Sequence, residues 1–280
     1  LEERWSYGEG ETKVARIQVK GFITDQGKDN LFANSMSMAE RVIREIRSAT
    51  QDLQVKAILL EVDSPGGEIT PADDIYYELQ RFKTSDPQRR VIAFFRGLSA
   101  SGGYYVAMAS DWIVCEPTCI VGSIGVIMQG LNWSTLSDKV GVTDVTLTSG
   151  PSKDLLNPFQ PVRETDKEIL QTVVNGLYRR FLSIVCEGRG LPESVLRPYA
   201  DGRVFLPADA LEIGLVDQIG YFDSAMEACR IILEEKQLRF IRYANRTGFL
   251  ESLTEVRSPI PDLQTLAEQS RARALFYWNR

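Results

Sequence analysis

The sequence predicts an α/β fold with a parallel sheet, and three observations support this prediction. Runs of apolar, often β-branched residues, as in buried strands, alternate with stretches whose apolar residues recur at helical spacing. Glycine, proline and serine cluster directly after several of these runs, where strands would end. The 280 residues, 44% of them apolar and 25% charged, can bury a substantial core.

The expected elements alternate along the chain. Residues 13–23 alternate apolar and polar side chains like a strand, residues 35–50 have the periodicity of a helix, and residues 55–62 form an apolar run typical of a buried strand. Further helices are expected over 71–82, after Ser101, and over 164–187, 191–199, 207–214 and 223–235, and further strands over 90–95, 112–115, 144–148 and 239–243. We expect one domain over 13–237, a flexible segment over 1–12 and a C-terminal extension of uncertain role over 238–280.

Composition excludes several classes of function. A net charge of -6 without a stripe of basic residues argues against nucleic-acid binding. No apolar run reaches the roughly 18 residues that a membrane-spanning helix needs. The four cysteines form no disulfide framework and no zinc motif, so we expect free thiols, no metal and no cofactor.

The chain contains no histidine. A Ser-His-Asp triad, a Cys-His pair and a His-ligated metal are therefore impossible. A serine nucleophile in this chain would have to give its proton to a carboxylate or to a lysine that loses its charge on burial.

Ser101 is the first candidate for such a nucleophile. It lies where an apolar strand ends and a helix begins, and Gly102 and Gly103 follow it. Glycines allow a substrate to approach the backbone N–H groups, and the helix N-terminus adds partial positive charge. A serine at this place could equally be an ordinary helix N-cap.

Two further features are expected at the same edge of the sheet, because the carboxyl ends of parallel strands lie at one edge. The turn at residues 64–67 could present the Gly67 N–H to an oxyanion beside that of Gly102, and Lys153 lies in a loop after the strand expected over 144–148. Each has a plainer interpretation: an ordinary turn for 64–67, and an ion pair with Asp154 for Lys153.

Five motifs together resemble the signal peptide peptidase A family of bacterial serine peptidases. They are Asp-Ser-Pro-Gly-Gly at 63–67, Ser-Ala-Ser-Gly-Gly-Tyr-Tyr at 99–105, Val-Gly-Ser-Ile-Gly-Val at 121–126, Ser-Gly-Pro-Ser-Lys-Asp at 149–154, and Ala-Asp-Gly-Arg-Val at 200–204 followed by Gly-Leu-Val-Asp-Gln-Ile-Gly at 214–220. The resemblance covers residues 13–235. It implies a ClpP/crotonase-like spiral of ββα units, a ring-like homo-oligomer and a Ser-Lys dyad.

The resemblance also implies a role for each matching residue. Ser101 corresponds to the nucleophile, Lys153 to the general base, and Ser123 to the hydroxyl that positions this lysine. Gly67 and Gly102 correspond to the oxyanion-hole donors. From its sequence context alone, Ser123 is equally a small residue that permits close packing.

The chain departs from the family pattern at two positions. Asp63 replaces a common asparagine, and Glu68 stands where some members have a third glycine. The second change makes the rim of the site more acidic.

The function implied is an endopeptidase that degrades signal peptides and other hydrophobic segments through an acyl-enzyme. It would work outside the cytoplasm at a bacterial membrane, held by an anchor that is not in this chain. Residues 124–126 could bind an extended peptide by strand addition. The alternatives are a crotonase-like acyl-CoA enzyme and a catalytically silent, membrane-associated scaffold.

Overall fold

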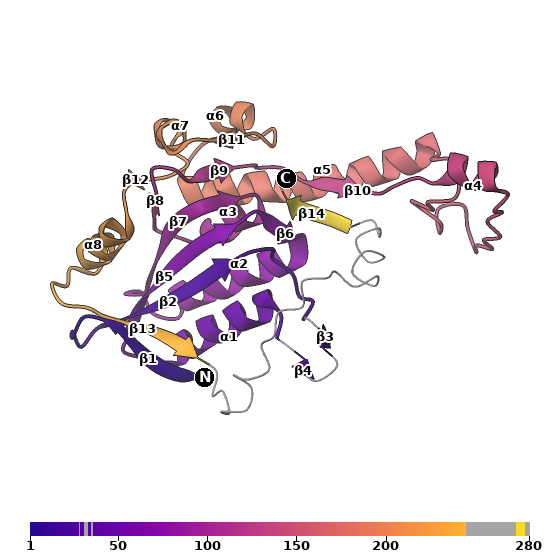
Figure 1. Cartoon of the computed structure of the whole chain (residues 1–280). Coiled ribbons are helices and arrows are strands. Elements are labelled where there is room, and N and C mark those ends of the chain that lie inside the picture. The colour runs from indigo at the N-terminus through magenta and orange to yellow at the C-terminus, as the bar shows by residue number, and fades with distance from the viewer. Residues whose placement is uncertain (28, 31–32, 35, 245–272, 278–280) are drawn as a thin grey trace.

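A computed structural model describes residues 1–27, 29–30, 33–34, 36–244 and 273–277 (Figure 1). Its main sheet runs in the order β1-β13-β2-β5-β7-β8-β12, with β9 beside the end of β7 and β11 beside β9. The strands from β13 to β12 on this path are parallel, and β1 is antiparallel to β13. Their bounds are β1 Glu2–Tyr7, β2 Lys13–Lys20, β5 Val55–Ser64, β7 Arg90–Ala100, β8 Trp112–Cys115, β9 Ile120–Gly122, β11 Val204–Phe205, β12 Gln218–Ile219 and β13 Arg239–Ala244.

Helices cover both faces of this sheet. On β5, Ile58 and Leu60 face the core shared with α1 (Met38–Gln51), α2 (Ile69–Thr84), α3 (Gly102–Ala107) and α5 (Glu164–Arg189). The alternate residues Ala57 and Leu59 face α8 (Phe222–Leu233) on the other side. Burial on both faces explains why 55–62 is apolar throughout.

The helix boundaries have local causes. Ser37 caps α1 by accepting a hydrogen bond from the Glu40 N–H at 3.0 Å, so this helix begins three residues later than expected. Acidic residues at 164 and 166 favour the start of α5, and Gly190 ends this helix in the left-handed conformation with φ 63°.

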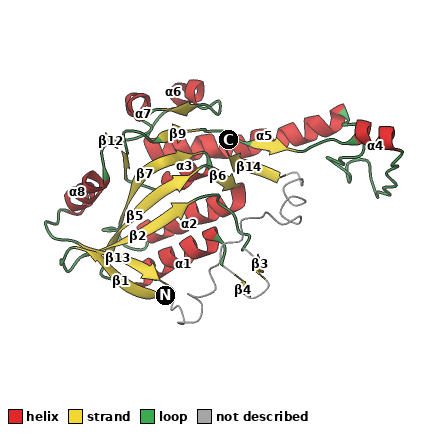
Figure 2. Ribbon diagram, viewed as in Figure 1, coloured by secondary structure: helices red, strands yellow, loops and turns green. Residues whose placement is uncertain are grey.

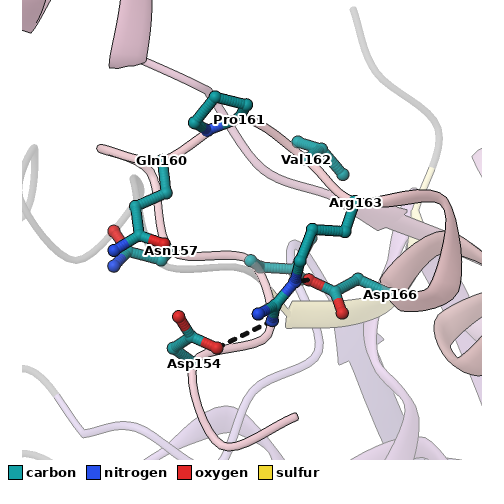
Figure 3. Close-up of a pocket in the computed structure, with 8 residues that line it drawn as sticks. Asp154, Asn157, Gln160, Pro161, Val162, Arg163 and Asp166 are labelled. Atoms are coloured by element: carbon teal, nitrogen blue, oxygen red, sulfur yellow. Dashed lines mark hydrogen bonds and ion pairs between the residues drawn. The ribbon is translucent and has the colours of Figure 1, made fainter. Parts of the chain in front are cut away.

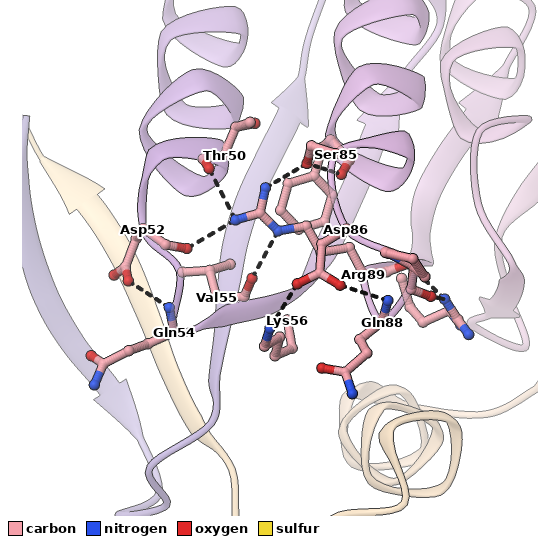
Figure 4. Close-up of polar contacts among 12 residues, drawn as sticks. Thr50, Asp52, Gln54, Val55, Lys56, Ser85, Asp86, Gln88 and Arg89 are labelled. Carbon is pink, nitrogen blue, oxygen red and sulfur yellow. Dashed lines mark hydrogen bonds and ion pairs between the residues drawn. The ribbon is translucent and has the colours of Figure 1, made fainter.

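Arg89 joins the C-terminal ends of α1 and α2 to the sheet (Figure 4). Its guanidinium is buried and donates to the carbonyl oxygens of Thr50, Asp52 and Val55 and to the Ser85 hydroxyl, at 2.6–3.3 Å. One charged side chain therefore supplies hydrogen-bond donors to three carbonyl oxygens at the end of α1 and the start of β5.

A long projection leaves the body of the molecule (Figure 1). We call residues 127–175 the arm. It comprises β10 (Ile127–Gln129), α4 (Ser134–Val140), the loop at 141–163 and the first half of α5, and Figure 2 shows the loop without regular structure. Phe181 and Val185, in the second half of α5, are fully buried in the body, whereas Ile169 and Val173 in the arm are exposed.

Short elements complete the described fold. A second sheet contains β10, β14 (Arg273–Tyr277) and β6 (Gly66–Glu68) in that order, with β14 antiparallel to both neighbours. The remaining ones are the pair β3 (Asp29–Asn30) and β4 (Ala33–Asn34), the helices α6 (Glu193–Leu196) and α7 (Pro207–Ile213), and a 3-10 turn at Arg197–Tyr199.

The structure corrects three expectations. Residues 144–148 form no strand and lie in the arm, so Lys153 does not follow a strand of the sheet. Residues 2–7, expected to be flexible, form β1 and pair with β13. Because β13 inserts between β1 and β2, the sheet extends past the expected boundary at residue 237. Most of 238–280 lies outside the described residues, and the ββα spiral stays a prediction.

Candidate active site

Ser101 stands between β7 and α3 in a strained backbone conformation. Its φ is 54° and its ψ is -119°. Non-glycine residues rarely adopt positive φ, and such strain persists only where the surroundings impose it. The residue occupies the N-cap position of α3, yet its side chain makes no capping hydrogen bond. The hydroxyl is therefore not used to start the helix, which removes the plainer interpretation of this serine.

Ser123 lies beside Ser101, at the end of the neighbouring strand. Ala100 on β7 is paired with Gly122 on β9, and the Ser101 N–H donates to the Gly122 carbonyl at 2.8 Å. Ser123 also has positive φ, 53°, and is 6% exposed against 1% for Ser101. Two buried serines thus follow adjacent parallel strands, and both have the positive φ that non-glycine residues rarely adopt.

Two backbone N–H groups near Ser101 are the candidate oxyanion donors, and the edge of one of them, Gly67, is paired with β14 in this structure. Gly102 is the first residue of α3, so its N–H has no acceptor within the helix. Gly67 pairs with Ile23 through the flanking Gly66 carbonyl and Glu68 N–H, both at 2.8–2.9 Å. Since successive residues of a strand point their N–H groups to opposite edges, the Gly67 N–H faces away from Ile23.

The glycines at these places are required by close packing. A Cβ on Gly67 would lie 2.0 Å from the Ile23 carbonyl oxygen, and one on Gly103 would lie 2.9 Å from the Ser64 carbonyl oxygen. The turn before Gly67 is held by Ser64, whose hydroxyl donates to the Gly21 carbonyl at 2.7 Å and accepts from the Gly66 N–H. This packing places the start of α3 against the end of β5 and β6.

The backbone of β14 lies along the edge to which the Gly67 N–H points. Residues 275–277 pair antiparallel with 66–68, and residues 273–275 pair antiparallel with 127–129 of β10. A segment near the C-terminus thus completes a sheet directly beside Gly67. The expected strand-addition segment, 124–126, lies immediately before β10 and is not itself paired with β14.

Lys153 lies apart from these groups. It is exposed in the loop of the arm, and among the described residues no hydrogen bond joins its ammonium to Ser101 or Ser123. Within one chain the structure therefore brings together Ser101, Ser123, Gly102 and Gly67, and leaves Lys153 elsewhere.

The loop that carries Lys153 is nevertheless well held. Asp154 pairs with Arg163 at 2.7 Å instead of with Lys153, and Arg163 also donates to Asp166 at 2.8 Å, which ties the loop to the start of α5 beside a small pocket (Figure 3). These two carboxylates raise the pKa of Arg163. This anchoring residue was not predicted, because an arginine before an acidic helix start is common and has no distinctive signal.

The two departures from the family pattern have structural roles. Asp63 accepts a hydrogen bond from the Leu98 N–H at 3.3 Å, which links the ends of β5 and β7. Glu68 accepts one from the Thr24 hydroxyl at 3.2 Å. Neither side chain is placed in the chemistry by these contacts.

Two other kinds of feature are absent from the part of the chain that the structure describes. Within the described ranges, no cluster of cysteine, aspartate and glutamate side chains could hold a metal ion. In the same ranges, no helix combines the length and the apolar character that crossing a bilayer demands.

Known proteins match the chain over the region that builds this site. The model of peptidase family S49 matches residues 83–236, and the model named Clp protease matches 32–114. An Enterococcus faecium protein named "Putative signal peptide peptidase SppA" is 37% identical over 255 residues, which are 90% of this chain and 73% of that protein. The match to Clp protease and the helix-covered sheet agree with the expected α/β, ClpP-like fold.

Two longer proteins are also similar. Protease 4 of Haemophilus influenzae is 31% identical over 85% of this chain and 37% of its own length. The chloroplastic serine protease SPPA of Arabidopsis thaliana is 30% identical over 80% of this chain and 33% of its own length. With these matches over most of its length, the chain belongs to peptidase family S49, the family of signal peptide peptidase A and protease 4, and is a serine peptidase.

Proposed function

We propose that this peptidase cleaves signal peptides and other hydrophobic segments with Ser101 as nucleophile and Lys153 as general base. The observation that carries the proposal is Ser101 itself, a buried serine in a strained conformation whose hydroxyl is not committed to a cap, beside two backbone donors. Such strain is characteristic of nucleophiles mounted between a strand and a helix.

The reaction would proceed through an acyl-enzyme. Ser101 Oγ attacks the peptide carbonyl carbon and gives its proton to the neutral amine of Lys153. The oxyanion accepts hydrogen bonds from the Gly67 and Gly102 N–H groups, and the C–N bond breaks as the lysine ammonium returns the proton to the leaving amine. Lys153 then deprotonates water, which hydrolyses the ester. Ser123 would hold the lysine by a hydrogen bond.

Because Lys153 lies apart from Ser101 within one chain, the proposed dyad would form between two copies of the chain. A lysine base must be neutral, which calls for burial, and Lys153 is exposed in the arm while Ser101 is buried in the body. If the arm of one copy lies over the body of the next, Lys153 becomes buried beside the neighbour's Ser101. This arrangement repeats in one direction around a closed ring.

The surface of the arm supports this assembly. Large apolar side chains are exposed along it, more than an isolated projection in water would favour, and a partner would bury them. They are Ile127, Leu131, Trp133, Leu136, Val140, Val142, Val145, Leu147, Phe159, Val162, Ile169 and Val173.

The sheet formed by β6, β14 and β10 supports peptide binding. An extended substrate in the place of β14 would lie along the edge that the Gly67 N–H faces, which puts its carbonyl groups near the oxyanion donors. We further propose, from the resemblance alone, that the protein acts outside the cytoplasm at a bacterial membrane through an anchor outside this chain.

Cleavage of a hydrophobic peptide by the wild type and by two variants tests the function. Ser101→Ala and Lys153→Ala should each lose at least about 10³-fold in kcat. Ser110→Ala, another buried serine, and Lys139→Ala, another exposed arm lysine, are matched controls and should keep wild-type activity. Full activity in either dyad variant would refute the proposal. A serine-directed phosphonate that labels the wild type but not Ser101→Ala would exclude the acyl-CoA enzyme and the silent scaffold.

A further inference from the structure

One carboxylate connects the three elements on which the proposed site depends. Asp73 lies on α2, which begins directly after the Gly67 strand β6. Its Oδ1 accepts a hydrogen bond from the hydroxyl of Tyr105 at 2.5 Å. The same oxygen accepts from Arg180 Nε at 3.2 Å and Nη2 at 2.6 Å. Tyr105 is on α3, four residues after Ser101, and Arg180 is on α5, the helix that carries the arm.

Ring packing supports the same junction. The Tyr105 side chain is fully buried, 5.0 Å between ring centroids from Phe181 of α5 and 5.7 Å from Tyr76 of α2. Burial, followed by the hydrogen bond to Asp73, raises the pKa of the Tyr105 hydroxyl, which therefore stays a neutral donor. Helix α3 is thus held to its two neighbours both by edge-to-face and tilted ring contacts and by hydrogen bonds to one carboxylate oxygen.

Stability alone gives little reason for the ion pair in this junction. The side chains of Arg180 and Asp73 are 54% and 32% exposed, and pairs so open to water contribute little to the free energy of folding. A charge-assisted contact at the point where α5 leaves the body has a different use, because it fixes the angle between α5 and α3. A small rotation there moves the far end of a 26-residue helix by several times more.

We propose that Asp73 is a positioning residue for catalysis, which holds the nucleophile helix and the arm in one geometry through Tyr105 and Arg180. The inference rests on the proposed function, since it matters only if Ser101 and an arm lysine react together. In a ring, the direction of each arm determines whether its Lys153 reaches the neighbouring Ser101. Loss of the contact should therefore slow the chemistry more than it weakens the fold.

The test measures the rate at which a serine-directed phosphonate labels Ser101, together with the unfolding temperature of each variant. Tyr105→Phe and Arg180→Gln should each lower the labelling rate about tenfold, because small displacements of reacting groups can cost up to about 10²-fold. The double variant should be no slower than the slower single variant, since both changes break contacts with one carboxylate oxygen. Arg180→Lys should recover part of the rate.

Tyr104→Phe is the matched control. Tyr104 is the adjacent buried tyrosine of α3, and its hydroxyl donates instead to the Leu215 carbonyl at 2.8 Å. The effect of Tyr104→Phe on the labelling rate, large or small, should multiply with the effect of Arg180→Gln in the double variant.

Three results would each overturn the inference and leave the proposed function intact. The first is a wild-type labelling rate in Tyr105→Phe, and the second is effects of Tyr105→Phe and Arg180→Gln that simply multiply. The third is a fall in labelling rate that equals the fall seen in any other variant with the same unfolding temperature. Absence of Ser101 labelling in the wild type would overturn both.

Discussion

Two inactive variants should restore each other's activity if Lys153 serves the Ser101 of a neighbouring copy. The perturbation is co-expression of Ser101→Ala with Lys153→Ala in equal amounts, so that both assemble into the same rings. Each site then draws its serine from one copy and its lysine from the next. A site is complete only when the first copy is the lysine variant and the second is the serine variant. Random mixing makes about one site in four complete, so about a quarter of wild-type activity should return.

The assay is cleavage of a hydrophobic peptide by assemblies purified through a different tag on each variant. Either variant alone, assembled in the same way, gives the background. A dyad within one chain predicts no recovery, because every copy then lacks one of its own two residues. Recovery no higher than this background, in assemblies shown to contain both variants, would refute the shared dyad. Dilution of the wild type gives a second readout, since activity per chain should fall as the rings dissociate.

Three further predictions concern the site and its support. Gly67→Ala should lower kcat by at least about 10²-fold, because the added Cβ would lie 2.0 Å from the Ile23 carbonyl oxygen and displace an oxyanion donor; wild-type kinetics in a folded variant would contradict this. Deletion of residues from 273 onward should lower the KM for peptides, because β14 occupies the edge where a substrate would pair; an unchanged KM would show that the two do not compete. Arg89→Met should destabilise the fold by about 3 kcal/mol, since it leaves three carbonyl oxygens without donors. Denaturant unfolding should measure this loss, and kcat should stay unchanged.

The sequence predicted the main sheet well, because its strands are buried on both faces. Residues 55–62 and 90–95 are apolar for a physical reason that a single chain contains, namely helices on one side and α8 on the other. The structure extends both strands toward the site, to Ser64 and Ala100. The added residues, 63–64 and 96–100, mix charged, small and apolar side chains without a regular alternation, so periodicity alone could not assign them to strands.

The sequence failed where pairing depends on distant segments. Residues 2–7 are polar and exposed, and they form a strand only because β13 offers its edge from the other end of the chain. Residues 144–148 alternate polar and apolar side chains like a strand but find no partner strand in the described chain. Val145 and Leu147 are instead 82% and 95% exposed. The apolar side chains of this alternating pattern therefore form part of the exposed surface of the arm.

The candidate site divides in the same way. Ser101, Gly102 and Gly67 could be proposed from the residues because each follows a strand of one sheet, and parallel strands bring such residues together within a chain. Ser123 was assigned a role only from the family resemblance. Lys153 could be assigned its role only from the family resemblance. Its expected place at the sheet edge depended on a strand at 144–148, and these residues form no strand.

The absence of a strand at 144–148 also bears on how the Lys153 amine could be buried. A base at the end of a sheet strand would be buried by its own fold, whereas a base on an arm must be buried by something else. Arg163 pairs with Asp154 of the Lys153 loop and with Asp166 of α5. Asp73 pairs with Arg180 of α5 and accepts from Tyr105 of α3. These contacts give the arm a defined direction relative to the body. A defined direction of the arm would serve no purpose if Lys153 stayed exposed to water. It is useful if the arm must place one amine against a surface that belongs to another copy, and the mixed-ring experiment measures that placement directly.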